Sequence, residues 1–235
     1  LVYASKDYSD EANFVVNLLK KYNFSDTSIL EYGSGTGKHA KVLCDLGYTV
    51  TGVELSEDMH NRALSSPSFK SILGDIRSYK SNHMFNASIS MFHVFSYLTS
   101  NNDVERALQS VYNNLNPGGL FVFDYWFTLG VLSLKPECRY KQFDLPENTV
   151  HRAVTFEHIC DKNCVNVIYN YIIVEKINNT ARSFSEIHKM RYFSIPEIKF
   201  FAEKIGFRLL ESNELISSNP PSLKTWSTFS VLQKQ

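Results

Sequence analysis

The sequence predicts an α/β protein with a mostly parallel sheet that is covered by helices on both faces. Up to about residue 135, short apolar segments rich in β-branched residues alternate strictly with amphipathic helical segments. Such alternation requires right-handed crossovers, so ligands are expected at the carboxyl ends of the strands. Residues 150–193 differ, because long alternating segments joined by DKN and NNT turns favour an antiparallel meander.

Each element of the alternating half has its own local signal. Ser9 and Ser56 can cap the first turns of helices, and Gly47 ends another helix. In chain order we expect a helix over 9–22, a strand over 28–31, a helix over 39–46, a strand over 48–54, a helix over 56–63, strands over 69–73 and 86–93, a helix over 104–115 and a strand over 120–125.

The second half begins with the meander. HRAVTFEHI, VNVIYNYIIVEKI and RSFSEIHKMRYF read as its strands, and we assign residues 136–193 to an antiparallel β insert within a single domain over 1–235. Helical periodicity returns over 196–205, with Pro in the first turn. Strands over 207–215 and 226–232 then complete the main sheet.

Composition excludes several classes of function. The 24 Lys and Arg residues balance 24 Asp and Glu residues, so we expect no nucleic-acid partner. No apolar run approaches the roughly 20 residues that span a bilayer, and no apolar signal segment begins the chain. His158, Cys160 and Cys164 lack a fourth metal ligand, and the four cysteines form no disulfide framework. We therefore expect a cytoplasmic protein without a metal or a membrane partner.

A glycine-rich segment follows the first strand. Gly33, Gly35 and Gly37 let the backbone approach a ligand that a Cβ would exclude. A dinucleotide fingerprint would need a further glycine at position 38, which is Lys38, and a P-loop would need one at Tyr32. Both common nucleotide motifs therefore fail.

Acidic residues end three successive strands. Glu31 ends the first, Glu54 follows Gly33 by 21 residues and ends the second, and Asp75 ends the third. Glu54 can accept both hydroxyls of a ribose, while Asp75 and the apolar Ile76 suit an adenine edge. Three carboxylates leave no place for a pyrophosphate, so the ligand is expected to be an adenosine with a neutral or cationic appendage.

These residues resemble the class I S-adenosylmethionine-dependent methyltransferases. EYGSGTG, VTGVELSEDM, GDI, SISMFHVFSYL and LNPGGLFVFDYW occur in the order of that family, although Asn86 stands where many relatives have Asp. The chain is most similar to small-molecule members, the N-methyltransferases of nucleotide-linked amino sugars. The resemblance implies a Rossmann-like seven-stranded sheet whose last strand is antiparallel. It also implies S-adenosylmethionine as cofactor and S-adenosylhomocysteine as product.

Site residues follow from the motifs and the resemblance. His93 and Tyr97, just past the fourth strand, are candidate proton acceptors, with a purely structural role for His93 equally open. Tyr125 and Trp126 are expected just past the fifth strand, facing the methyl group. The expected substrate pocket comprises Tyr3, Tyr125, Trp126, His188 and Arg191. The expected cofactor contacts are Tyr8, Glu31, Gly33, Gly35, Gly37, Glu54, Leu55, Asp75, Ile76 and Phe92, and the resemblance implies that Tyr3 and Tyr8 form a lid.

The expected function is methyl transfer to an amine or hydroxyl of a small polar metabolite, such as a nucleotide-linked amino sugar. One alternative is O-methylation of a carboxyl or phosphate-type acceptor, which would need a basic residue from the set Arg139, Arg152 and Arg191. Another is a non-catalytic protein that binds S-adenosylmethionine and a partner. The β insert can cover the pocket as a substrate cover, and its edges also permit a homodimer.

Overall fold

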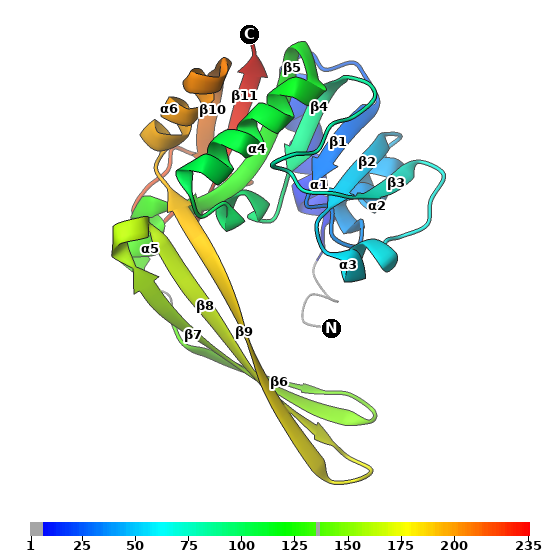
Figure 1. The fold of residues 1–235 in the computed structure, drawn as a ribbon, viewed down its shortest axis with the longest axis vertical. Helices are drawn as coiled ribbons and strands as arrows, with labels where there is room; N and C mark the ends of the chain where they lie inside the picture. The colour runs from blue at the N-terminus through cyan, green and yellow to red at the C-terminus, as the bar shows by residue number, and fades with distance from the viewer. Residues whose placement is uncertain (1–6, 135–136) are drawn as a thin grey trace.

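The computed structural model describes residues 7–134 and 137–235, and it shows a twisted sheet from which a long β arm projects (Figure 1). The elements up to the arm are α1 Ser9–Lys21, β1 Ser28–Tyr32, α2 Lys38–Asp45, β2 Thr49–Glu54, α3 Glu57–Asn61, β3 Phe69–Leu73, β4 Phe85–Ser90, the 3₁₀ helix η1 Val94–Tyr97, α4 Asn101–Asn114, β5 Leu115–Phe127 and α5 Thr128–Leu134. After the arm follow α6 Ile195–Ile205, β10 Phe207–Glu214 and β11 Ser227–Lys234.

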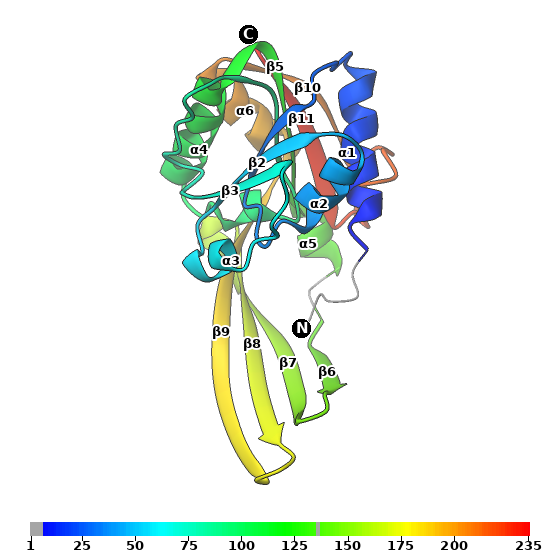
Figure 2. The ribbon, with the colours of Figure 1, turned by 90° about the vertical axis from the view of Figure 1, so that its right-hand side faces the viewer.

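The main sheet has the strand order β3-β2-β1-β4-β5-β11-β10 within the described residues. Neighbours from β3 to β5 pair in parallel, whereas β11 is antiparallel to both β5 and β10. Helices α1 and α2 bury their apolar faces on one side of the sheet, and α4 and α6 do so on the other (Figure 2). The predicted mostly parallel sheet with an antiparallel last strand is confirmed.

Helix starts depend on individual side chains. Ser100 accepts a hydrogen bond from the backbone N–H of Asp103, so α4 begins at Asn101, earlier than expected. The expected cap at Ser9 is wrong, because Ser9 is already helical and its own N–H donates to Asp7. The N-terminal turn of α1 therefore starts next to Tyr8, which lies close to the glycine loop.

Two strand ends differ from expectation. β4 ends at Ser90 because Phe92 and His93 both adopt the left-handed conformation, with φ of 65° and 62°. β5 continues to Phe127, so Tyr125 lies inside the strand rather than at its carboxyl end. The short helix α5, which the sequence patterns did not predict, follows at once.

The arm consists of four antiparallel strands, β6 Arg139–Asp144, β7 Asn148–Ile159, β8 Cys164–Glu175 and β9 Thr180–Phe193. Figures 1 and 2 show it extending away from the main sheet. At its base, Tyr192 and Phe193 of β9 pair in parallel with Trp126 and Phe127 of β5. The predicted antiparallel insert is confirmed, with β6 as a strand that the patterns missed. Its use as a substrate cover or a dimer contact stays a prediction.

Within the described residues, no helix combines the length and the apolar character needed to cross a membrane.

Candidate active site

The glycine loop after β1 is built on backbone conformations that favour glycine. Gly33, Gly35 and Gly37 have φ of 70°, 56° and 81°. A Cβ on Gly33 would lie 2.5 Å from a methyl carbon of Val94, and one on Gly37 would lie 2.4 Å from the ring of Phe69. At Gly35 the nearest atom would be a sulfur 3.9 Å away. The loop is thus closed on two sides and open at Gly35, as a ligand cradle requires.

Glu54 ends β2 with its carboxylate held beneath this loop. Oε2 accepts the N–H of Gly35 at 2.7 Å, and Oε1 accepts the N–H of Ser56 at 2.8 Å. Each oxygen retains a second lone pair, which can accept a ligand hydroxyl. The adjacent Leu55 is 66% exposed. The buried Glu54 carboxylate therefore fits the role expected for a ribose acceptor.

Glu31, at the end of β1, is buried and only partly neutralised. Its Oε1 lies 3.7 Å from Nδ1 of His39, while its Oε2 has no hydrogen-bond partner. Burial raises the pKa of Glu31 to about 7. His39 is held from the other side by Glu11, with 2.7 Å between Nε2 and Oε2. A buried acceptor without a partner fits a ligand that carries positive charge.

Aromatic side chains flank the loop from α1 and from the end of β4. The ring centroid of Tyr8 lies 4.8 Å from that of His39 and 6.5 Å from that of Phe92, and Nζ of Lys38 lies 5.2 Å from the Tyr8 ring. Tyr3, the other expected lid residue, falls outside the described residues. Two of the expected aromatic contacts, Tyr8 and Phe92, are therefore brought together.

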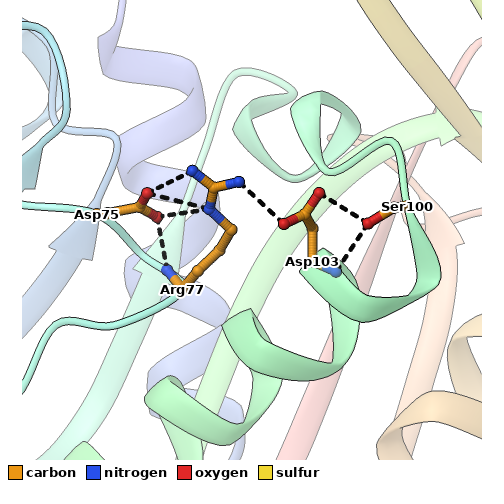
Figure 3. Close-up of polar contacts among 4 residues, drawn as sticks. All are labelled: Asp75, Arg77, Ser100 and Asp103. Atoms are coloured by element: carbon orange, nitrogen blue, oxygen red, sulfur yellow. Dashed lines mark hydrogen bonds and ion pairs between the residues drawn. The ribbon is translucent and has the colours of Figure 1, made fainter.

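Asp75 does not present a free carboxylate to an adenine edge (Figure 3). The backbone N–H of Arg77 donates to Oδ1 at 2.8 Å, and its guanidinium donates to both oxygens at 2.5 to 3.0 Å. The same guanidinium donates to Asp103 at 2.9 Å. These hydrogen bonds hold the pKa of Asp75 below its usual range. The neighbouring Ile76 packs against the core under α4. Sequence reasoning missed Arg77, although it stands only two residues after the acid.

His93 forms a pair with a fully buried acid that sequence reasoning left without a role. The backbone N–H of His93 donates to Oδ1 of Asp124 at 2.9 Å. Its ring Nδ1 lies 2.7 Å from Oδ2, at an angle that departs from a linear hydrogen bond. A carboxylate beside Nδ1 favours the proton on that nitrogen, which leaves the lone pair on Nε2. Oγ of Ser227 lies 3.4 Å from Nε2. An acid inside an apolar strand was the signal that could have revealed this pair.

The other expected proton acceptor, Tyr97, joins the main domain to the arm. Its hydroxyl lies 2.7 Å from Nδ1 of His188 on β9, and the His188 ring meets the edge of Tyr169 with centroids 5.2 Å apart. Trp126 lies nearby, with its ring centroid 6.4 Å from that of His93 and 5.0 Å from that of Trp226. Tyr97 and His188 therefore meet where η1 approaches β9, and Trp126 lies beside His93 near the end of β5.

Two expected pocket residues lie elsewhere. Tyr125 is fully buried on the side of β5 that packs under α4 and α6, its hydroxyl is 3.1 Å from Oγ of Ser230, and burial raises its pKa to about 12. Because side chains alternate along a strand, Asp124 and Trp126 point the opposite way. Arg191 is buried as well, and it donates to Glu197 and to Asn101 at 2.6 Å each. The expectation that Tyr125 and Arg191 line the pocket is wrong.

The family profile described as a methyltransferase domain matches residues 3–212. The chain belongs to this methyltransferase family. Among curated proteins, dTDP-3-amino-3,4,6-trideoxy-alpha-D-glucopyranose N,N-dimethyltransferase of Streptomyces venezuelae is 32% identical over 123 residues, which cover 52% of this chain and 52% of that protein. The chain thus spans about half the length of this relative. The family that the sequence motifs predicted is therefore confirmed.

Solved structures share the fold of this methyltransferase domain. The sugar N-methyltransferase KedS8 from Streptoalloteichus sp ATCC 53650 superposes with a TM-score of 0.84 at 20% identity, covering 99% of this chain and 90% of that one. An S-adenosylmethionine-dependent methyltransferase from Clostridium acetobutylicum ATCC 824 gives a TM-score of 0.81 at 19% identity, covering 100% and 94%. The predicted Rossmann-like methyltransferase fold is confirmed.

Proposed function

We propose that this methyltransferase transfers a methyl group from S-adenosylmethionine to the amine of a small polar metabolite, of the class of nucleotide-linked amino sugars. The names of two similar proteins support the acceptor class, because the Streptomyces venezuelae relative and KedS8 are both described as sugar N-methyltransferases. The observation that carries the proposal is the pairing of an orphaned buried carboxylate oxygen, on Glu31, with the open glycine cradle beside it.

The residues around the cradle suit this cofactor. S-adenosylmethionine supplies a methyl group on a positively charged sulfur. Glu54 has the lone pairs to accept ribose hydroxyls, and Glu31 offers a buried acceptor to a cationic appendage. The rings of Tyr8 and Phe92 add a cation–π surface, worth roughly 0.5–2 kcal/mol for a cation over a ring face. Asp75 can take part in adenine recognition if its carboxylate binds the adenine while it still accepts hydrogen bonds from Arg77.

Amine methylation also requires a proton acceptor and a dry reaction site. In our proposal Nε2 of His93 takes the proton from the acceptor amine, and the buried carboxylate of Asp124 stabilises the resulting imidazolium. Tyr97, paired with His188, forms the second proton path. Trp126 helps to exclude water from the same region.

The positions and partners of the three candidate arginines favour an amine acceptor over an anionic one. O-methylation of a carboxyl or phosphate would need a cation beside the reacting oxygen. Arg191 is already engaged by Glu197 and Asn101. Arg139 and Arg152 lie on β6 and β7, in the arm.

Calorimetry with S-adenosylmethionine tests the cofactor. The wild-type chain should bind it, and Glu54→Gln should weaken binding at least tenfold, because one carboxylate oxygen becomes an amide that cannot accept a hydroxyl. Glu57→Gln, an exposed acid three residues further on in α3, is the matched control and should leave affinity unchanged. Absence of binding by the wild-type chain at millimolar ligand would end the proposal.

Methyl-release assays test the acceptor. A panel of nucleotide-linked amino sugars should give turnover, while matched sugar acids and hydroxyl-only sugars should not. Turnover on the acids alone would favour O-methylation. Tight cofactor binding with no turnover on either panel would favour a non-catalytic binding protein.

A further inference from the structure

One face of the arm, which we call its inner face, continues from the site that Tyr97 and His188 form. Because alternate residues of a strand share a face, the register fixes its members. They include Arg139, Lys141 and Phe143 of β6, Val150, Arg152, Val154 and Phe156 of β7, Val167, Tyr169, Tyr171 and Ile173 of β8, and Arg182, Phe184, Glu186 and His188 of β9.

Arg152 is anomalous on this face. Its side chain is buried, at 8% exposure, on a part of the arm where most neighbours are half-buried or exposed. The guanidinium carbon lies 5.7 Å from the ring centroids of both Phe143 and Tyr169. Its Nε has no hydrogen-bond partner, and no Asp or Glu of residues 7–134 and 137–235 forms an ion pair with it. Burying a cation without a counter-ion costs free energy, so we infer that a ligand supplies the anion that pairs with Arg152.

The surroundings of Arg152 are basic rather than acidic. Lys141 is its register partner on β6, and Arg139 pairs with Val154 one step along the same face. None of the inner-face positions of β6 and β7 holds Asp or Glu. The nearest acid of the face, Glu186, lies on β9 opposite Tyr169 and is 3.8 Å from His188. Two or three cations gathered on adjacent strands suit an anion of more than one charge.

We propose that Arg152, together with Lys141, forms a subsite on the arm for the phosphate groups of the methyl acceptor. This rests on the proposed function, because it specifies how the acceptor is held. The planar guanidinium can donate two parallel hydrogen bonds to a phosphate.

The spacing along the arm fits such an acceptor. His188 is opposite Val167, and Arg152 is opposite Tyr171, which lies four residues further along β8. Four residues of a strand span roughly 13 Å. A sugar between Tyr97 and the phosphates can bridge that length. The stacked rings of Tyr171 and Phe184, 4.9 Å apart, lie in the same register row as Arg152 and offer a flat surface for a nucleobase beside the phosphates.

Calorimetry in the absence of S-adenosylmethionine tests the subsite, with inorganic pyrophosphate, thymidine diphosphate, thymidine and succinate as probes. The wild-type chain should bind pyrophosphate and thymidine diphosphate, with thymidine and succinate much weaker. Arg152→Gln should lower the affinity for both phosphates at least tenfold. Lys141→Gln, on the exposed edge strand, should lower the affinity for both phosphates about threefold. This second variant keeps the test valid if the Arg152 variant fails to fold.

Arg208→Gln is the matched control, because it removes a surface arginine from β10, outside the arm, and should leave phosphate binding unchanged. Succinate binding as tight as pyrophosphate would overturn the assignment to phosphate. Equal pyrophosphate affinity in wild type, Arg152→Gln and Lys141→Gln would overturn the subsite itself, as would no phosphate binding by the wild-type chain. Because these titrations use no cofactor, their failure is distinct from failure of methyl transfer, which the S-adenosylmethionine titration reports.

Discussion

Replacing Asp124 by Asn tests whether the buried acid sets the protonation of His93. In the wild type, the Asp124 carboxylate accepts the backbone N–H of His93 at 2.9 Å and lies 2.7 Å from ring Nδ1. An amide that keeps the first contact through its oxygen turns its NH₂ group toward Nδ1. The ring then has to accept at Nδ1 and to carry its proton on Nε2, the nitrogen that faces the acceptor amine in our proposal.

The size of the effect follows from the lost charge. The Nδ1–Oδ2 contact joins the carboxylate to the imidazolium that forms when the ring takes a proton, and we assign it about 1.5–3 kcal/mol, as for an interaction with a charged group. Each 1.36 kcal/mol of barrier changes a rate tenfold. Asp124→Asn should therefore lower kcat about 10- to 150-fold, with little change in the affinity for S-adenosylmethionine.

Two measurements check this reasoning. Nitrogen-15 NMR of the imidazole should show the Nδ1–H tautomer in the wild type and the Nε2–H tautomer in the variant. Adding Asp124→Asn to a His93→Gln background should cost little further activity, because the acid acts through the ring. An unchanged tautomer together with a kcat within twofold of wild type would refute the role given to Asp124.

Three further predictions concern the edge of the sheet. Burial raises the pKa of Glu31 to about 7, so the stability linked to its neutral form is complete below the unfolded pKa, near 4.5, and is lost as pH rises through 7. Urea titrations should therefore find Glu31→Gln more stable than wild type at pH 8 and equal to it at pH 4. Gly37→Ala should lower the stability by about 2–4 kcal/mol, because left-handed strain and a ring clash add, whereas Gly47→Ala, with positive φ and no atom within 4 Å, should show only the strain. Arg77→Met should cost about 1 kcal/mol above pH 5 and less as the pH falls below 3.8, because the hydrogen bonds from Arg77 stabilise only the charged form of Asp75 and so lower its pKa; an equal cost at pH 7 and pH 2 in urea melts would contradict this.

The sequence patterns were sufficient for the alternation of helices and strands before the arm and for the acids at the strand ends. Glu31 and Glu54 fall where alternation and spacing put them, because parallel strands bring their carboxyl ends to one edge. The environment of Asp75 could not be predicted in the same way. Arg77 also binds Asp103, which reaches it only after α4 has packed on the sheet.

The errors at β4 and β5 have local causes. Phe92 reads as one more apolar strand residue, yet its backbone turns left-handed and moves His93 toward Asp124. Tyr125 was expected to face the methyl group because the strand was predicted to end there. The strand continues to Phe127, and alternation then puts Tyr125 into the core.

The way the arm is attached has a consequence for how this segment can vary. The chain leaves the main sheet after Phe127 and returns at Phe193, and these two residues are register partners. A segment whose ends are neighbours in one ladder can be lengthened, shortened or exchanged while the strands on either side stay in place. A graft cut between this pair would carry Arg152 and His188 with it and leave His93 and Asp124 behind. The arm is thus a natural unit for transplantation between methyltransferases of this fold.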